Sequence, residues 1–477
     1  MRMGEGIEPL AADEMPLPLG VEAETGARLP ELTTEDLKRI DDEAAEVCQR
    51  GVNAGPAFPV IPDIEPNDLS QSGWAAILPQ DIDPEIRSAL QPLFQQRERD
   101  AGPLFRVFEG AEGVLKGDSA RAWLERRDVG LNLVDPALGV PVYLMLVGSP
   151  DQISFEFQYL LDTYWCVGRL DFPSAAEYRA YAERVVAYEN SPSIPQRRQA
   201  AIFATMHPGD RPTGLFHNQV ALPLLRGSDK IRPLGQKFQI EPLLAAEATK
   251  ENLAALLQGK RTGAPPALLF SGSHGLAFPL SDTEQAVKQG AILCQDFPGS
   301  GPVDRDHYFA ASDLPPGASL LGMIHFLFGC YGGGCPKYDT FSRRRDGSPK
   351  QIMADTVVAR LPQKILAAGG LAVLAHIDRA WACSFQNSQA APQVQEFRTV
   401  LVKLMQGQRI GLATDELNLR WAVLSAELSM TMASARTAAA CVSTAEVANR
   451  WVARNDARNY VILGDPAVRL RVECMAA

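Results

Sequence analysis

Short, continuous apolar runs alternate with helical patterns over most of the chain. Typical runs are GWAAILP (73–79), VYLMLVGSP (142–150), ALLFSGSHG (267–275) and GLAVLAHIDRAW (370–381). Strands buried on both faces read as such runs, and parallel strands need crossover helices between them. The alternation therefore predicts the α/β class with a largely parallel sheet. The chain has 477 residues, which is enough for a large core and more than one domain-sized unit.

Three regions differ in pattern. Residues 1–55 offer little to a core except TTEDLKRIDDEAAEVCQR (33–50), whose Thr-x-x-Asp start predicts a capped helix, and the preceding 30 residues read as flexible. Residues 56–195 carry a first αβ series, which ends in the linker-like SPSIPQRR. Residues 196–477 carry a second series. We expect a flexible N-terminal segment, an N-terminal αβ subdomain and a larger αβ domain.

Charge and composition exclude several functions. The net charge is −11 and the pI is near 5.2, whereas nonspecific binding to nucleic acid or to anionic membranes rewards basic surfaces. No apolar stretch approaches the roughly 20 residues that span a bilayer, so membrane insertion is not expected. The N-terminus lacks the basic start and apolar core of a secretory signal, and eight spread cysteines do not form a disulfide framework. These features predict a cytoplasmic protein.

Polar or reactive residues follow several of the expected strands. They are His207 with Asp210, then His274, then Cys330, then Asp378. In open parallel sheets, ligands and reactive groups gather beyond the carboxyl ends of the strands. If these strands are neighbours, the residues face one crevice.

His274 and Cys330 form the most informative pair. A cysteine nucleophile acts as its thiolate, and a nearby imidazole takes the proton or stabilises the anion. Glycines flank both residues in SGSHG and FGCYGGG, where they allow close approach of a substrate and expose backbone N–H groups. The alternative is a buried small thiol beside an unrelated turn histidine.

Other interpretations of these residues are weaker. A metal site of His274, Cys330 and Cys335 would use a C-x4-C spacing at the edge of zinc patterns, without a second Cys/His pair. A Cys330–Cys335 disulfide does not suit a reducing compartment. The run YGGG lacks the Gly-Lys-Ser/Thr ending of a phosphate loop, so no cofactor and no metal are expected.

Several further side chains are candidates for substrate binding. Asp210, Asp296 and Asp378 each lie at or just after a strand end, where a carboxylate could select a basic side chain or could serve a turn or helix cap. Trp381 could pack over the cleft or lie in the core.

Four segments together resemble the caspase-like cysteine peptidases, within them the gingipain-like and CHAT-domain branch. They are SGSHG (271–275), FGCYGGG (328–334), GLAVLAHIDRAW and the closing YVILGDPAVRL (460–470). The resemblance is clearest over residues 195–477, and residues 140–195 resemble the first subdomain of gingipain-type enzymes. It implies a three-layer αβα sandwich. It also implies that Cys330 attacks the scissile carbonyl, His274 protonates the leaving amine, and the N–H groups of Gly275 and Cys330 form the oxyanion hole.

The resemblance also implies a substrate class. Asp378 and Asp210 match places where relatives keep the acid of the specificity pocket, so cleavage of a protein or peptide after Arg or Lys is expected. Two features of the caspase pattern are absent: the Gln-Ala before the cysteine and the arginine pocket for aspartate. In addition, Cys335 stands where a small polar residue is expected. The leading hypothesis is a cytosolic endopeptidase of a bacterial defence or cell-death pathway, with the need for an activating partner left open. The alternatives are an inactive scaffold that binds proteins through residues 1–140, and a small-molecule hydrolase or metal-binding protein.

Overall fold

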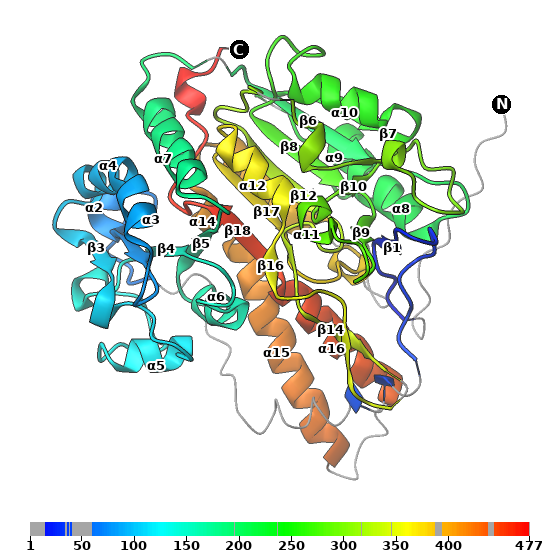
Figure 1. Ribbon diagram of the computed structural model, residues 1–477, viewed down its shortest axis with the longest axis horizontal. Coiled ribbons are helices and arrows are strands. Elements are labelled where there is room, and N and C mark those ends of the chain that lie inside the picture. Colours follow the sequence, from blue (N-terminus) through cyan, green and yellow to red (C-terminus); the bar gives the residue numbers. More distant parts are fainter. Residues whose placement is uncertain are drawn as a thin grey trace.

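A ten-stranded sheet forms the centre of the protein, as seen in a computed structural model (Figure 1). The structure describes residues 15–33, 36–37, 39–40, 60–194, 196–235, 237–315, 317–344, 346–386, 394–436 and 443–476. In sheet order, the strands are β3 (Phe105–Phe108), β2 (Trp74–Ile77), β4 (Tyr143–Val147), β5 (Cys166–Leu170), β18 (Tyr460–Gly464), β17 (Ala372–His376), β12 (Ile324–Phe328), β8 (Leu268–Gly272), β6 (Gln199–Ala204) and β7 (Gln239–Leu244). The predicted α/β class is confirmed.

The sheet consists of two parallel halves that run in opposite directions. β18 pairs in parallel with β5 but antiparallel with β17, and the remaining pairs are parallel. The carboxyl ends of β17, β12, β8 and β6 therefore share one edge, and the strand ends of the other half face the opposite edge. This arrangement concentrates the residues singled out in the sequence at one edge of the second half.

Helices cover both faces and complete the predicted αβα sandwich (Figure 1). Residues of α7 and α12 contact each other and the strands β17 and β18. The helices are α2 (Leu69–Ser72), α3 (Pro84–Ala89), α4 (Gln91–Ala101), α5 (Ala120–Glu125), α6 (Phe155–Leu161), α7 (Ala175–Asn190), α8 (Arg211–Phe216), α9 (Leu222–Arg226), α10 (Lys250–Leu257), α11 (Gln285–Lys288), α12 (Arg360–Ala367), α13 (Gln395–Met405), α14 (Ile410–Ala413), α15 (Asp415–Arg436) and α16 (Thr444–Arg458).

Strand β12 shows why an apolar run forms a central strand. All five of its residues are buried, because helices cover both faces of the sheet. Phe326 and Phe328 are two positions apart and therefore point to the same face, where both rings pack on Phe397 of α13. His325 points to the other face and shares a 2.7 Å hydrogen bond with Ser271 of β8. His325 is thus a core histidine, as the apolar surroundings predict, although among the described residues its buried Nδ1 has no hydrogen-bond partner.

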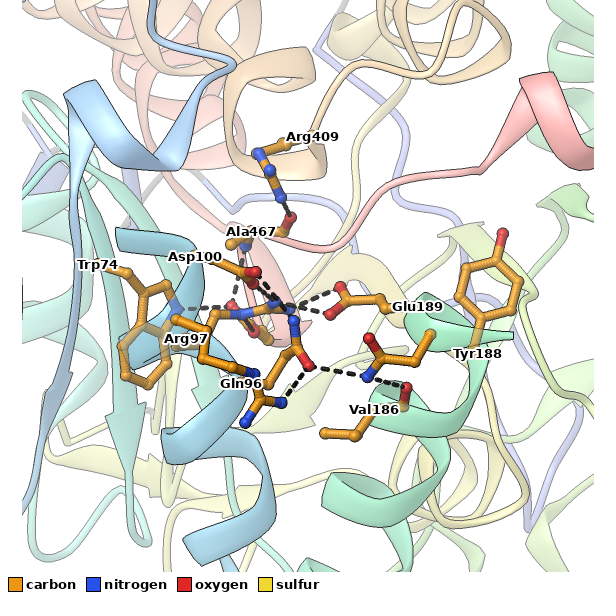
Figure 2. A network of polar contacts seen from close by, with 12 residues as sticks. Trp74, Gln96, Arg97, Asp100, Val186, Tyr188, Glu189, Arg409 and Ala467 are labelled. Carbon is orange, nitrogen blue, oxygen red and sulfur yellow. Dashed lines mark hydrogen bonds and ion pairs between the residues drawn. The ribbon is translucent and has the colours of Figure 1, made fainter. Parts of the chain in front are cut away.

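A buried ion cluster links the first half of the sheet to the chain end (Figure 2). The guanidinium of Arg97 in α4 donates to Asp465, directly after β18, at 2.7 Å and to Glu189 of α7 at 2.7 and 2.8 Å. Trp74 of β2 donates its indole N–H to the same Asp465. Arg97 is fully buried, so these carboxylates compensate a charge that has lost its hydration. The sheet and this cluster both contain residues from the expected subdomain 56–195 and from the expected domain 196–477.

The described part of the N-terminal segment is packed rather than free. β1 (Gly20–Glu22) joins β9 (Gly275–Ala277), β10 (Ile292–Leu293) and β11 (Tyr308–Phe309) in a smaller sheet. Leu17 and Leu19, where the sequence reads as flexible, are 4% and 0% exposed. Most of the helix expected over residues 33–50 lies outside the described residues.

Two short pairings complete the structure around the sheet. β13 (Gly334–Cys335) pairs with β16 (Val357–Val358), and β14 (Tyr338–Arg343) pairs with β15 (Pro349–Gln351). Within the described ranges, none of the helices combines the length and the apolar character needed to cross a bilayer.

Candidate active site

His274 and Cys330 leave adjacent strands at equivalent positions. β8 and β12 are parallel neighbours, with Gly272 opposite Phe328 at their last pair. Each functional residue follows two positions later, and the backbone N–H of Ser273 still donates to the carbonyl of Phe328. The two residues expected to form the dyad therefore emerge side by side at the carboxyl edge of the sheet.

The chain turns sharply immediately after Cys330. Tyr331 has φ +58°, which lies in the left-handed region that residues other than glycine rarely adopt. Its backbone N–H donates to the carbonyl of Asp378 at 3.0 Å, and this contact holds the turn in place. Strained residues of this kind cluster at functional sites, where they fix the direction of a side chain. Here the left-handed conformation of Tyr331 turns the chain directly after Cys330, at the end of β12.

Two backbone N–H groups converge beside the thiol. Gly275 and Cys330 both donate to one oxygen, the carbonyl of Leu19, at 3.1 and 3.0 Å. A Cβ at position 275 would lie 1.7 Å from the carbonyl oxygen of Cys330, so only glycine allows this approach. Two N–H groups on one oxygen are the arrangement that stabilises an oxyanion during acyl transfer. The structure thus brings together the two residues expected to form an oxyanion hole.

Asp210 contacts the imidazole of His274. Its Oδ2 lies 2.9 Å from His274 Nε2 and also accepts from the N–H and the hydroxyl of Thr213, at the start of α8. Burial alone would raise the pKa of Asp210, but the charge of His274 and the hydrogen bonds from His274 and Thr213 hold that pKa well below its usual value. Among the described residues, the buried Nδ1 of His274 has no hydrogen-bond partner. Asp210 therefore orients the ring and leaves Nδ1 for another group.

The thiol of Cys330 is shielded from solvent. The residue is 1% exposed, and its sulfur lies 3.3 Å from the backbone nitrogen and 3.6 Å from the carbonyl oxygen of Ala380. Burial raises the pKa of Cys330, and the backbone hydrogen bond of Ala380 opposes the shift only in part. The thiol is therefore protonated in this arrangement, since the thiolate needs a hydrated or positively charged environment.

The structure does not bring the three candidate acids into one pocket. Asp378 is buried, and its carboxylate accepts from the backbone N–H of Arg379. Burial, and then the charge of Asp339, raise the pKa of Asp378. Asp296 is exposed and accepts from the backbone N–H of Lys250 at the start of α10, a helix-capping role. Of the three, only Asp210 lies beside His274, which it contacts, and it lines the pocket next to that ring.

Trp381 and Cys335 are both buried in the interior of the protein. The ring of Trp381 is buried against Phe341, with ring centroids 5.0 Å apart. The backbone of Trp381 is bridged to Pro18. Cys335 is a free, buried thiol in the short strand β13, and burial raises its pKa. Cys330 is also free, so the two thiols form no disulfide. In the described ranges, no three His, Cys, Asp or Glu side chains are grouped so that they could hold a metal ion.

Sequence reasoning missed the backbone strand that runs through the site. Leu19 donates its N–H to the carbonyl of Ala380 at 2.8 Å, and Ala382 donates to the carbonyl of Leu17 at 2.9 Å. The segment PLPLG (16–20) alternates Leu with Pro, but its prolines favour a loop. The one sequence signal for a strand was the alternation of Leu with Pro. A strand can accept proline at positions whose N–H is not needed for pairing.

Comparisons with known proteins complete the description of the site. No family model matches the chain, and no curated protein matches it. A solved structure described as a protease matches with 14% identity and a TM-score of 0.47, over 84% of this chain and 80% of the other. The Arg specific cysteine proteinase gingipain R matches with 13% identity and a TM-score of 0.46, over 84% and 79%. The separase of Saccharomyces cerevisiae, in its complex with securin, matches with 12% identity and a TM-score of 0.30, over 91% of this chain and 23% of that chain.

Proposed function

We propose that the protein is a cysteine endopeptidase in which Cys330 is the nucleophile and His274 the general acid and base. The observation that carries the proposal is the convergence of the Gly275 and Cys330 N–H groups on one peptide carbonyl, at the strand end that also bears the thiol. The His274–Asp210 pair lies at the next strand end. These are the groups that acyl transfer from a peptide requires.

The proposed reaction has two steps. His274 takes the proton of the Cys330 thiol, the resulting thiolate attacks the scissile carbonyl carbon with formation of a C–S bond, and the N–H groups of Gly275 and Cys330 stabilise the charge on the oxygen. The C–N bond then breaks as His274 gives its proton to the leaving amine. Water, deprotonated by His274, hydrolyses the thioester and restores the thiol. Asp210 keeps the ring oriented through Nε2 so that Nδ1 serves the reacting groups.

The preference for Arg or Lys is not part of this proposal. The carboxylates of Asp210 and Asp296 are bound by groups of the chain itself, and the carboxylate of Asp378 is buried beside Arg379. A pocket for a basic side chain needs a carboxylate that is ionised and free to pair with it. The raised pKa of Asp378 works against that condition.

Substitution of Cys330 tests the proposal. Because Leu19 occupies the two N–H groups, hydrolysis of a denatured protein such as casein is measured in the natural chain and in a Leu19→Asp chain. Cys330→Ala should abolish the hydrolysis measured in the Leu19→Asp chain and any hydrolysis measured in the natural chain, whereas Cys335→Ala, at a buried thiol nearby, should leave both unchanged. Absence of any hydrolysis that depends on Cys330 would contradict the peptidase and favour the scaffold alternative.

A further inference from the structure

The segment Leu17–Gly20 lies in the site as an extended strand. Pro18 is bridged antiparallel to Trp381, and hydrogen bonds flank this pair on both sides. The pair 18/381 is thus a non-hydrogen-bonded one, which explains why a proline is accepted there. Peptides that bind by adding a strand to an exposed edge obtain their affinity from such backbone bonds.

The carbonyl of Leu19 occupies the place of a reacting carbonyl. Its oxygen accepts from Gly275 and Cys330, while its own N–H donates to Ala380. These three backbone hydrogen bonds hold Leu19 in the site, and two of them are made by the carbonyl of the Leu19–Gly20 peptide bond. The Leu19 side chain is fully buried with the main hydrophobic core, so the space that receives it is apolar.

The next residue passes directly over the thiol. A Cβ added to Gly20 would lie 2.8 Å from both Cβ and Sγ of Cys330, so only glycine fits at this position. Beyond it, β1 continues beside β9, with Gly20 opposite Gly275. A pocket of about 300 Å³ opens here, lined by Val21, Arg28 and the ring of His274 among others. His274 therefore lies on the side of the chain that follows the Leu19–Gly20 bond, where a leaving amine would be.

We infer that Leu17–Gly20 is an internal blocking strand in the substrate groove, with Leu19 in the place of the residue before the scissile bond. The inference rests on the proposed function and adds a substrate class. Substrates are extended polypeptide segments with leucine, or an apolar side chain of similar size, before the cleaved bond and glycine after it. The natural chain is inhibited until this strand leaves the groove.

Protection of the Cys330 thiol tests the blocking strand without reference to catalysis. The full chain is treated with iodoacetamide, and alkylation of each cysteine is followed by peptide mass spectrometry. Leu19→Asp should accelerate alkylation of Cys330 at least tenfold, because a carboxylate is expelled from an apolar space. The matched control is Leu138→Asp at a position that is 70% exposed, where the rate should not change. An unchanged rate at Cys330 in Leu19→Asp would overturn the inference.

A second variant and an internal standard distinguish expulsion of the strand from unfolding of the protein. Gly20→Leu places a side chain against Cys330 and should also expel the strand, with the same acceleration. The thiol of Cys166, buried in β5, should stay protected in both variants. Acceleration at Cys330 together with Cys166, in both variants, would show loss of the fold and would overturn the inference.

Peptide amides test the substrate class. In the Leu19→Asp chain, kcat/KM for an aminocoumarin amide of Pro-Leu-Pro-Leu should exceed that of the same peptide ending in Arg or Lys at least tenfold. Equal or higher values for Arg or Lys would overturn the assignment of leucine. If alkylation of Cys330 accelerates but no peptide is hydrolysed, the blocking strand stands and the proposed peptidase function fails.

Discussion

The carboxylate Oδ2 of Asp210 lies 2.9 Å from the imidazole Nε2 of His274, across the gap between the loops that follow β6 and β8. This contact joins a helix cap to the proposed general base, because the same carboxylate caps α8 through Thr213. A group that both anchors a helix and orients a ring has little freedom to move. The relationship gives the first prediction.

Asp210→Asn should lower kcat of the proposed peptidase by about 100-fold or more, which is the range that general acid–base catalysis contributes. Asparagine can still cap α8, so the melting temperature should change little. The loss arises because a neutral amide can also donate a hydrogen bond and no longer fixes the tautomer and orientation of the His274 ring. The assay is peptide hydrolysis in the Leu19→Asp background. The control is Asp296→Asn, at an exposed capping residue, which should keep full activity.

Gly275→Ala should remove the oxyanion site. The new Cβ would lie 1.7 Å from the Cys330 carbonyl oxygen, so the two strand ends must separate and their N–H groups can no longer meet on one oxygen. Loss of one such donor typically lowers kcat by about 100- to 1,000-fold. The matched control is Gly130→Ala at an exposed glycine whose nearest neighbour is the flexible amide end of Asn132. Retention of kcat in Gly275→Ala would contradict the assignment.

Arg97→Met should destabilise the protein by about 3–5 kcal/mol, the cost of breaking a buried ion pair and leaving its partner uncompensated. The partner is Asp465, which is also fully buried. The measurement is the free energy of unfolding in urea. Arg99→Met, two positions later on the same helix but exposed, should change it by no more than about 0.5 kcal/mol. Equal effects of the two substitutions would contradict the role given to Arg97.

His325 should make stability depend on pH. Burial lowers the pKa of His325 to about 3, from an ordinary value of 6.5. Between these values the unfolded chain binds a proton that the folded chain does not, so stability falls as pH falls below 6.5, by about 1.4 kcal/mol per pH unit. His325→Gln removes this contribution. Its free energy of unfolding, relative to the natural chain, should therefore rise by about 2 kcal/mol between pH 6.5 and pH 5. A difference that does not vary with pH would show that His325 titrates alike in both states.

The sheet and the adjacent strand ends that carry His274 and Cys330 were predictable because both depend on short-range patterns. A buried strand such as Ile324–Phe328 must be apolar on both faces, and that requirement appears in the sequence directly. Glycines at positions 275 and 329 mark places where backbones approach closely, because a Cβ at either would lie 2.8 Å or less from another backbone oxygen. Parallel neighbours then bring the two strand ends together.

The remaining features depend on contacts between distant residues. An apolar strand reads the same in either direction, so Tyr460–Gly464 gave no sign that it runs antiparallel to β17. The partner of Asp210 lies 64 positions away, and the turn carboxylate reads like any helix cap. The prolines of PLPLG hide its strand conformation in the sequence, since that conformation comes from hydrogen bonds to distant residues such as Ala380. Its role is visible only once Leu19 is seen against Gly275.

The central place of β18 has a consequence for the order in which the protein can be assembled. β18 separates the two halves of the sheet, yet it is the last strand of the sheet to be synthesised. The sheet that carries the site is therefore incomplete until β18 has been made, whereas Leu17–Gly20 precedes every strand of that sheet in the chain. The blocking strand is present before the groove exists. The chain that folds into the groove therefore already carries the segment that fills it.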